Sequence, residues 1–346
     1  MVASKTESSS PVSPEGHLSH IAWASIELLH NVVRTLTLLH EEAGRPFPVV
    51  RYRAKVKLHG SNCAVLVGEH DIATQSRTTM LTPRSDYKGF SAWVHEHAAY
   101  FRGLRPGLVV FGEWCGPGVE PGMAVSQAPR KLFAVFAIRD GARIIHEPDE
   151  IAALLAASPA PRPADLHVLP WEGEPFTLDF GARAQLEGGA AALNQRVAEV
   201  EREDPWVRRT FQVSGLGEGL VLYPIAVDDG PAPVDPEGLA ALMFKAKGDK
   251  HRTAATKQAV QVDTSVVASV DEFVALMVSE PRLQQGLATV CDGVASPQAT
   301  GKFLTWLTAD VRKESAAELA AAGLQWSQVD KAVQARARAW YLAQRR

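Results

Sequence analysis

Lys57 stands out in this sequence as a candidate nucleophile. It lies in the stretch Ala54–Asn62, A-K-V-K-L-H-G-S-N, between two β-prone runs. Because turn residues bound these runs, we expect a strand, a tight bend and a second strand. Gly60 would let the backbone approach a ligand that any Cβ would obstruct. Taken alone, the stretch fits a surface lysine before a turn glycine equally well.

A lysine amine attacks only after it loses its proton, which requires burial or neighbouring positive charge. Met243–Lys247 offers such charge, because alternation along the expected strand puts Lys245 and Lys247 on one face. Two ammonium groups that face one way repel each other unless an anion, such as a polyphosphate, lies between them. We therefore expect both lysines to assist Lys57. The alternative is an exposed edge strand whose lysines prevent aggregation.

Four further residues have side chains suited to a nucleotide or a metal ion. Glu113 ends an apolar run and Glu218 opens another, and carboxylates at strand ends are ligands for a hard divalent ion or for ribose hydroxyls. Phe136 has the ring to stack on a purine, and the Arg77 guanidinium can bind two phosphate oxygens. Each also has a simpler interpretation: a solvated turn glutamate, a core aromatic or a surface arginine.

The pattern of elements predicts where these residues are held. Residues 1–16 are rich in Ser and Pro and should form a disordered tail. His17–Ala43 has helical apolar spacing, which predicts one helix or a broken pair. From Pro46 to Lys250, short β-rich runs alternate irregularly with helical pieces, which indicates an α+β domain with antiparallel sheets and flanking helices. After a linker at residues 251–262, only helical patterns follow, so residues 263–346 should form a small all-helical domain.

Length and composition agree with this organisation and narrow the class of protein. The 346 residues favour two domains, and 46% hydrophobic with 22% charged residues is typical of a globular protein. A net charge of −3 excludes a uniformly basic surface, so a nucleic-acid partner would need a local basic cleft. The three cysteines lack paired spacing, which favours a reducing compartment. No apolar run reaches the roughly 18 residues of a membrane span, so we expect a cytoplasmic protein without a membrane partner.

Six short motifs follow one another in an order that is more specific than any one of them. Their order resembles that of the covalent nucleotidyltransferases, the superfamily of ATP-dependent polynucleotide ligases and capping guanylyltransferases. The motifs are K-x-H-G-x-N at Lys57, S-R-T at Arg77, F-G-E at Glu113, V-F-x-I at Phe136, E-G-x-V-L at Glu218 and K-x-K at Lys245.

Within that superfamily, the sequence looks most like the RNA ligase 2 family. His59 stands where DNA ligases and capping enzymes usually carry aspartate, Asn62 follows the glycine by two, and residues 111–118 resemble the family's F-G-E-x-x-G-P-G motif. The resemblance is clear over residues 46–250. It is looser in the helical tail, at Thr300–Phe303 and Asp310–Glu314.

The resemblance implies an ATP-grasp-like adenylyltransferase domain over residues 17–250 and an RNA repair activity. Lys57 would take AMP from ATP and pass it to an RNA 5′-phosphate, after which a 3′-hydroxyl would displace AMP and seal a break, such as a nick in duplex RNA. ATP, magnesium or manganese, and RNA are the implied partners of a monomeric enzyme.

The resemblance also implies a role for each motif residue. Lys245 and Lys247 would neutralise phosphate charge and depress the pKa of Lys57, while Glu218 would position the metal. The remaining residues would bind the nucleotide, with Phe136 on adenine, Glu113 and Arg77 on ribose and phosphate, and His59, Gly60 and Asn62 along the phosphates.

Three departures from the family pattern leave adenine contacts and strand sealing open. Val56 stands where the phage enzyme of the RNA ligase 2 family has an acidic residue, and Tyr223 stands where that enzyme has a lysine. Ala137 replaces the aspartate that usually follows Phe136 in this motif. A DNA ligase or a capping enzyme is one alternative, although these usually append an all-β OB-fold barrel. A nucleotide- or RNA-binding module that has lost catalysis is another, although all three catalytic lysines are present.

Overall fold

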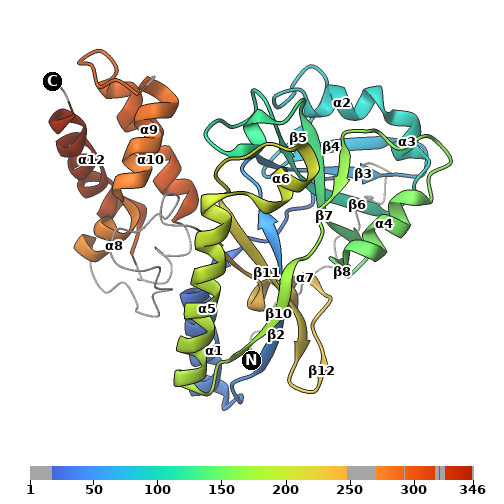
Figure 1. Ribbon diagram of the computed structural model, residues 1–346, viewed down its shortest axis with the longest axis horizontal. Helices are drawn as coiled ribbons and strands as arrows, with labels where there is room; N and C mark the ends of the chain where they lie inside the picture. Colours follow the sequence, from blue (N-terminus) through green and yellow to red (C-terminus); the bar gives the residue numbers. More distant parts are fainter. Residues whose placement is uncertain (1–17, 248–269, 292, 316–318, 320–323, 345–346) are drawn as a thin grey trace. The chain divides into compact units, whose positions relative to one another are not determined.

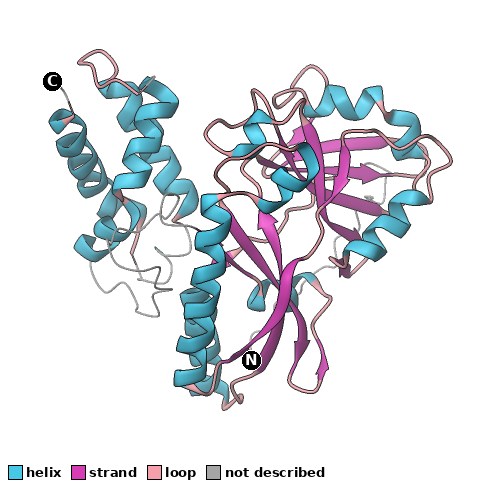
Figure 2. Cartoon of the chain, viewed as in Figure 1, coloured by secondary structure: helices cyan, strands magenta, loops and turns pink. Residues whose placement is uncertain are grey.

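The computed structural model describes residues 18–247, 270–291, 293–315, 319 and 324–344, shown in Figure 1 by position and in Figure 2 by secondary structure. The chain forms two compact units, and each is described by itself. The first contains Val50–Thr177 and Arg202–Met243 together with the segment that ends at Ile26. The second contains Glu27–Val49, Leu178–Glu201 and Phe244–Arg346. The predicted tail at 1–16 and linker at 251–262 lie outside the described residues, and the predicted domain boundaries stay predictions.

The larger sheet of the first unit has seven strands in the order β5-β4-β3-β6-β7-β8, with β9 pairing β7. Every pair is antiparallel except β7 with β9, which is parallel. The strands are β3 (Ser61–Val67), β4 (Ile72–Ser76), β5 (Met80–Leu81), β6 (Leu108–Cys115), β7 (Leu132–Asp140), β8 (Arg143–Ile145) and β9 (Leu166–Val168).

One face of this sheet carries the main hydrophobic core of the first unit. Side chains such as Val65, Val110, Phe133 and Ile138 pack there against helices that cover the sheet (Figure 1). The helices are α2 (Phe90–Glu96), α3 (Ala98–Arg102) and α4 (Pro148–Ala156). Because period-2 alternation sends every second side chain to the other face, residues such as Phe111 and Glu113 point away from this core.

The second sheet of the first unit is built on β2 (Val49–Lys57). It pairs antiparallel with β11 (Gly219–Val227), which also pairs β12 (Gly230–Pro231), and β10 (Glu172–Asp179) lies next to β2. The first unit also contains three short helical segments. They are the 3₁₀ helix η1 (Ala124–Gln127), α6 (Pro205–Phe211) and α7 (Pro236–Leu242).

The cap residues explain where the two short α-helices begin. The Asp204 carboxylate accepts hydrogen bonds from the amides of Trp206 and Val207 at the start of α6. Asp235 accepts one from the Gly238 amide at the start of α7. Each helix also has a proline in its first turn, where the missing N–H leaves no intrahelical bond unmade.

The helix predicted over His17–Ala43 is wrong for residues 18–28. These residues run extended, and α1 begins only at Leu29 and ends at Ala43. The Gln75 side chain accepts a hydrogen bond from the Ile21 amide at 2.9 Å and donates one to its carbonyl at 2.6 Å. Two residues on, Trp23 packs against the rings of Phe111 and Phe136, with centroid distances of 5.0 Å to each. These tertiary contacts override the helical spacing.

The second unit combines a short parallel pair with helices. β1 (Glu27–Leu28) pairs β13 (Phe244–Lys247), and the alternation predicted for β13 is confirmed, with Phe244 and Ala246 buried and Lys245 and Lys247 half-buried. Its long helices are α1 and α5 (Arg183–Arg202), and Gly44 ends α1 in the left-handed conformation at φ 63°.

The predicted helical pattern near the C-terminus is also confirmed. Its helices are α8 (Val270–Met277), α9 (Glu280–Cys291), α10 (Thr300–Glu314) and α12 (Trp326–Ala343). They share an apolar core that includes Phe273, Phe303, Leu307, Val333 and Tyr341.

Taken together, the described residues confirm an α+β protein with antiparallel sheets, flanking helices and a helical C-terminal region. A helix with the length and apolar character of a membrane span does not occur among the parts of the chain that the structure describes.

Candidate active site

The strand–bend–strand prediction around Lys57 is confirmed. β2 ends at Lys57 and β3 begins at Ser61, while Gly219, the first residue of β11, stands opposite Lys57 in the sheet. This register brings Glu218 to the end of β2. The Lys57 Nζ lies 2.7 Å from the Glu218 Oε2 and forms an ion pair with it. The lysine side chain is 23% exposed and that of Glu218 only 6%, so the pair lies at the edge of the buried interior.

His59 is the third member of this group. Its Nδ1 lies 3.5 Å from the same Glu218 oxygen, and its side chain is half-buried. The structure therefore brings the Glu218 carboxylate to both the Lys57 amine and the His59 imidazole, which belong to one motif, whereas Glu218 belongs to another. In this structure the Lys57 amine is therefore engaged by the Glu218 carboxylate.

A glycine is required at position 60 because its backbone lies very close to strand β6, rather than to a ligand. A Cβ built on Gly60 would lie 2.4 Å from the Trp114 carbonyl oxygen and 2.8 Å from the Cys115 Cβ, both in β6. Only glycine fits there, because a backbone carbonyl cannot move aside as a flexible side chain can. The expectation that Gly60 admits a ligand stays a prediction.

Asn62 and Glu113 are direct neighbours in the seven-stranded sheet, where they stand opposite each other on β3 and β6. The Asn62 Oδ1 is buried and has no hydrogen-bond partner among the described residues. A buried acceptor of this kind is rare and indicates a binding position for a donor or a cation.

Phe136 and Arg77 lie near the N-terminal segment. Phe136 is 8% exposed, and Trp23 packs edge-on against its ring. Arg77 follows β4 on an exposed turn, where its Nη2 lies 3.5 Å from the Ser25 Oγ. The role of Arg77 in phosphate binding stays a prediction.

Lys245 and Lys247 belong to the second unit and share one partner there. Their Nζ atoms lie 3.6 and 3.5 Å from the Glu314 Oε2, at the end of α10. All three side chains are less than one-fifth exposed. The anionic group that lies against the lysine pair in this structure is a carboxylate of the same chain, and the role of both lysines toward Lys57 and a polyphosphate stays a prediction.

Glu314, in the second unit, and Lys55, in the first, are two residues that the sequence analysis missed. Glu314 lies 67 positions beyond Lys247 along the chain, so only tertiary structure brings it to β13. Lys55 precedes Lys57 by two residues on the same strand, and alternation does point it the same way. Lys55 is nevertheless only 1% exposed, and the sequence around it gives no sign that this lysine is buried.

A divalent ion would find few protein ligands here. No group of three or more His, Cys, Asp or Glu side chains arranged to hold a metal occurs among the residues that the structure describes. The donor set nevertheless fits magnesium, which usually takes one or two carboxylates and completes its shell with phosphate and water oxygens. Glu218 supplies such a carboxylate, and the Asn62 Oδ1 has no hydrogen-bond partner among the described residues; their joint binding of one ion stays a prediction.

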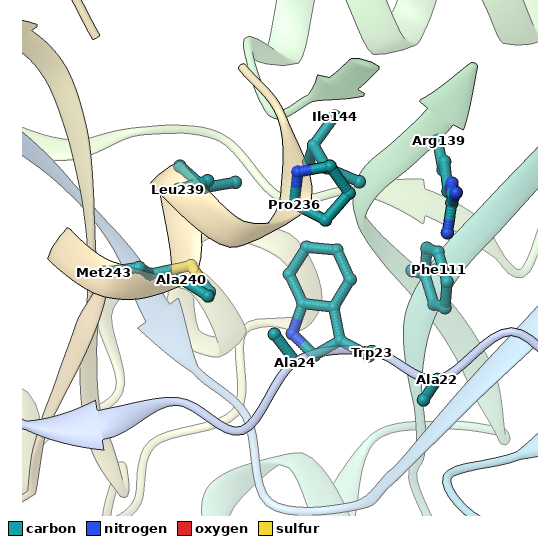
Figure 3. Close-up of a pocket in the computed structure, with 10 residues that line it drawn as sticks. All are labelled: Ala22, Trp23, Ala24, Phe111, Arg139, Ile144, Pro236, Leu239, Ala240 and Met243. Atoms are coloured by element: carbon teal, nitrogen blue, oxygen red, sulfur yellow. The ribbon is translucent and has the colours of Figure 1, made fainter. Parts of the chain in front are cut away.

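A small pocket lies at the packing site of Trp23 and is shown in Figure 3, with the indole in the middle of its lining. Its volume is about 20 Å³, which is room for about one water molecule and far too little for a nucleotide. The lining residues are Ala22, Trp23, Ala24, Phe111, Arg139, Ile144, Pro236, Leu239, Ala240 and Met243. Because none of the predicted site residues is among them, this pocket is not the candidate active site.

Comparison with known proteins assigns the family. The RNA ligase family model matches residues 50–232, more than half of the sequence, and the chain belongs to the RNA ligase family. The match spans the motifs from Lys57 to Glu218. The narrower RNA ligase 2 assignment stays a prediction. A search of curated proteins finds no match.

Among solved structures, the chain is similar to Naegleria gruberi RNA ligase. An alanine variant with ATP and Mn has a TM-score of 0.44 at 16% identity, covering 67% of this chain and 56% of that one. The same ligase with PPi has a TM-score of 0.43 at 17% identity, covering 67% and 57%. The chain thus matches little more than half the length of these ligases.

Proposed function

We propose that this chain is an ATP-dependent RNA ligase that joins 5′-phosphate and 3′-hydroxyl RNA ends through a lysine–AMP intermediate on Lys57. The observation that carries the proposal is the Lys57–Glu218 ion pair at the end of β2, within the segment that matches the RNA ligase family. It supplies an amine at the edge of the interior together with a carboxylate that can hold and release it.

In the first step, the Lys57 amine attacks the α-phosphorus of ATP. A nitrogen–phosphorus bond forms, the bond to the bridging oxygen of the β-phosphate breaks, and pyrophosphate leaves with that electron pair. The attacking amine must first give up a proton to solvent, and for that its ion pair with Glu218, at 2.7 Å, has to break. A magnesium ion held by Glu218 would offset the negative charge of the phosphates.

Glu218 thus has two functions that exclude each other. While its carboxylate is bonded to Lys57, the amine is engaged in that ion pair and is not available to attack. Once the carboxylate turns to a cation, the amine loses that partner. Binding of ATP with its metal would therefore activate the nucleophile, and metal-free protein would stay at rest.

The other motif residues would bind the rest of the nucleotide. Lys245 and Lys247 would bind the phosphates in place of the Glu314 carboxylate, and Phe136 would stack on adenine. Glu113 and Arg77 would hold ribose and phosphate. Asn62, whose Oδ1 lacks a partner among the described residues, would receive a donor or a metal-bound water, and His59 would contact the phosphates.

The second step takes place at the same AMP phosphorus as the first, and the third takes place at the phosphorus of the RNA 5′ end. The oxygen of an RNA 5′-phosphate attacks the Lys57-bound AMP, so that the nitrogen–phosphorus bond breaks and Lys57 is regenerated. A 3′-hydroxyl then attacks the RNA 5′-phosphorus and AMP leaves. The physical advantage is that the energy of ATP is kept first in the bond between Lys57 and AMP and then in the bond between AMP and the RNA 5′-phosphate, until the 3′-hydroxyl attacks. A nick in duplex RNA is the substrate that we expect.

The test is covalent labelling with ATP that carries ³²P at the α-phosphate, in the presence of magnesium. We expect the wild-type chain to be labelled and Lys57→Ala to remain unlabelled. Lys88→Ala is a matched control, because Lys88 also pairs with a glutamate, Glu120, at 2.7 Å and is 32% exposed. Labelling of Lys57→Ala at the wild-type level would refute the proposal, while labelling combined with sealing of DNA nicks alone would favour a DNA ligase.

A further inference from the structure

A β-bulge interrupts the pairing of β6 and β7 at Phe136. Phe111 stands opposite Ala137 and Gly112 opposite Val135, so Phe136 is the extra residue and has no partner in β6. A bulge bends its strand and redirects the side chain of the extra residue. It also takes the backbone groups of that residue out of the ladder, and a buried carbonyl needs another hydrogen-bond donor.

Lys55 supplies that donor from the other sheet of the first unit. Its Nζ donates a hydrogen bond to the Phe136 carbonyl oxygen at 2.8 Å, and the bond is buried. Lys55 lies on β2, two residues before Lys57, whereas Phe136 lies on β7. One side chain therefore joins the strand that carries the proposed nucleophile to the strand that carries the proposed adenine platform.

The surroundings of Lys55 let a buried ammonium persist. The Nζ lies 4.9 Å from the centre of the Trp171 ring and 5.4 Å from that of Tyr223, both within the range of cation–π attraction. The Trp171 Nε1 donates to the two carboxylate oxygens of Glu147, at 2.9 and 3.0 Å. Burial still lowers the pKa of Lys55 to about 7, with Glu147 opposing the shift.

Burial of the Lys55 ammonium costs free energy of hydration, so packing alone does not explain a lysine at this position. Methionine has a similar length and would fill the same volume without the loss of ammonium hydration. A lysine in this position therefore needs a reason other than packing, and the hydrogen bond to the bulge supplies one.

We propose that Lys55 is a positioning residue that holds the bulge at Phe136, and thereby sets the place of the adenine platform relative to Lys57. The inference rests on the proposed function, because Phe136 matters only if a nucleotide binds there. Lys55 touches neither substrate nor reacting atoms in this arrangement. It acts through the carbonyl that it binds.

The first test compares Lys55→Met with Arg53→Met in self-adenylylation. Arg53 lies on the same strand, and its guanidinium is 5.0 Å from the same Trp171 ring, so it is a matched control for the loss of a cation over that ring. We expect Lys55→Met to raise the KM for ATP about tenfold with a smaller change in kcat, and Arg53→Met to change KM less than about twofold. Equal effects of the two variants would overturn the proposal.

A double-mutant cycle with Phe136→Leu separates positioning from general damage. If Lys55 acts through Phe136, then Lys55→Met should raise the KM for ATP in the wild-type background and leave it nearly unchanged in Phe136→Leu. Multiplicative effects of the two substitutions on KM would contradict the proposal. Loss of cooperative melting in both Lys55→Met and Lys55→Leu would also contradict it, because Lys55 would then be required for folding.

The failure of this inference is distinguishable from the failure of the proposed function. If wild-type protein does not bind AMP covalently, the function is wrong and Lys55 has no nucleotide to position. If wild-type protein is labelled and Lys55→Met retains its KM for ATP, the function stands and the inference is wrong.

Discussion

Replacing Glu314 should strengthen the binding of ATP. The Glu314 carboxylate lies 3.5 Å from the Lys247 Nζ and 3.6 Å from the Lys245 Nζ, the two cations that we assign to the phosphates. ATP must displace this carboxylate before its own phosphates can bind the lysines. Glu314→Gln keeps the shape of the side chain and removes the charge that competes with the nucleotide.

The size of the effect follows from the geometry. At 3.5 Å and an effective dielectric constant of about 20, each pair is worth about 5 kcal/mol by Coulomb's law before desolvation. Desolvation and side-chain ordering remove most of this, and ion pairs of this partial exposure retain a net of about 1–2 kcal/mol. Since 1.4 kcal/mol corresponds to a factor of ten, we expect the KM for ATP to fall about tenfold.

The assay is the initial rate of self-adenylylation against ATP concentration. Glu280→Gln is the control, because Glu280 begins α9 in the same helical region and contacts Gln284 rather than a lysine. The effect of Glu314→Gln should shrink as salt is added, since the competition is electrostatic. An unchanged or higher KM would refute the reasoning, because Glu314 would then support the lysines rather than compete for them.

Three further predictions test other parts of the structure. Gly60→Ala should destabilise the protein by roughly 3 kcal/mol, because its Cβ would lie 2.4 Å from a β6 carbonyl oxygen; a melting temperature at the wild-type value would contradict this. Trp23→Ala should lower the free energy of unfolding by roughly 3–5 kcal/mol in denaturant titrations, since the ring is buried against Phe111 and Phe136, and a loss below 1 kcal/mol would show that the segment is dispensable. Burial lowers the pKa of Lys55 from 10.5 to about 7, so the unfolded chain binds more protons between these values. This group therefore makes the wild type more stable as pH rises from 7 to 10, by roughly 3–4 kcal/mol, a trend that should be absent in Lys55→Met.

Local sequence patterns predict the strands that bear most of the candidate site residues, but not the contacts between their side chains. The hairpin at Lys57, the strands that bear Glu113 and Phe136, and the alternation of Lys245 and Lys247 all follow from runs of four to nine residues. Such runs contain their own turn residues and periodicity, so no distant contact is needed to recognise them.

The rest depends on contacts between distant segments. The apolar residues before Leu29 have helical spacing but do not form a helix, because Trp23 is buried against the rings of Phe111 and Phe136. Both rings lie about 90 or more positions away in the sequence. The pairing of Glu314 with β13, and of Lys55 with the Phe136 carbonyl, requires the register of strands that a single sequence does not specify. A buried lysine in particular contradicts the rule that charges stay exposed, which is why the structure was needed to find it.

The most direct test of the account is to locate AMP on the protein. After incubation with ATP and magnesium, protease digestion and mass spectrometry should find a single AMP on the peptide that contains Lys57, and none after incubation without the metal. AMP on a peptide that lacks Lys57, or no covalent AMP at all, would contradict the central claim.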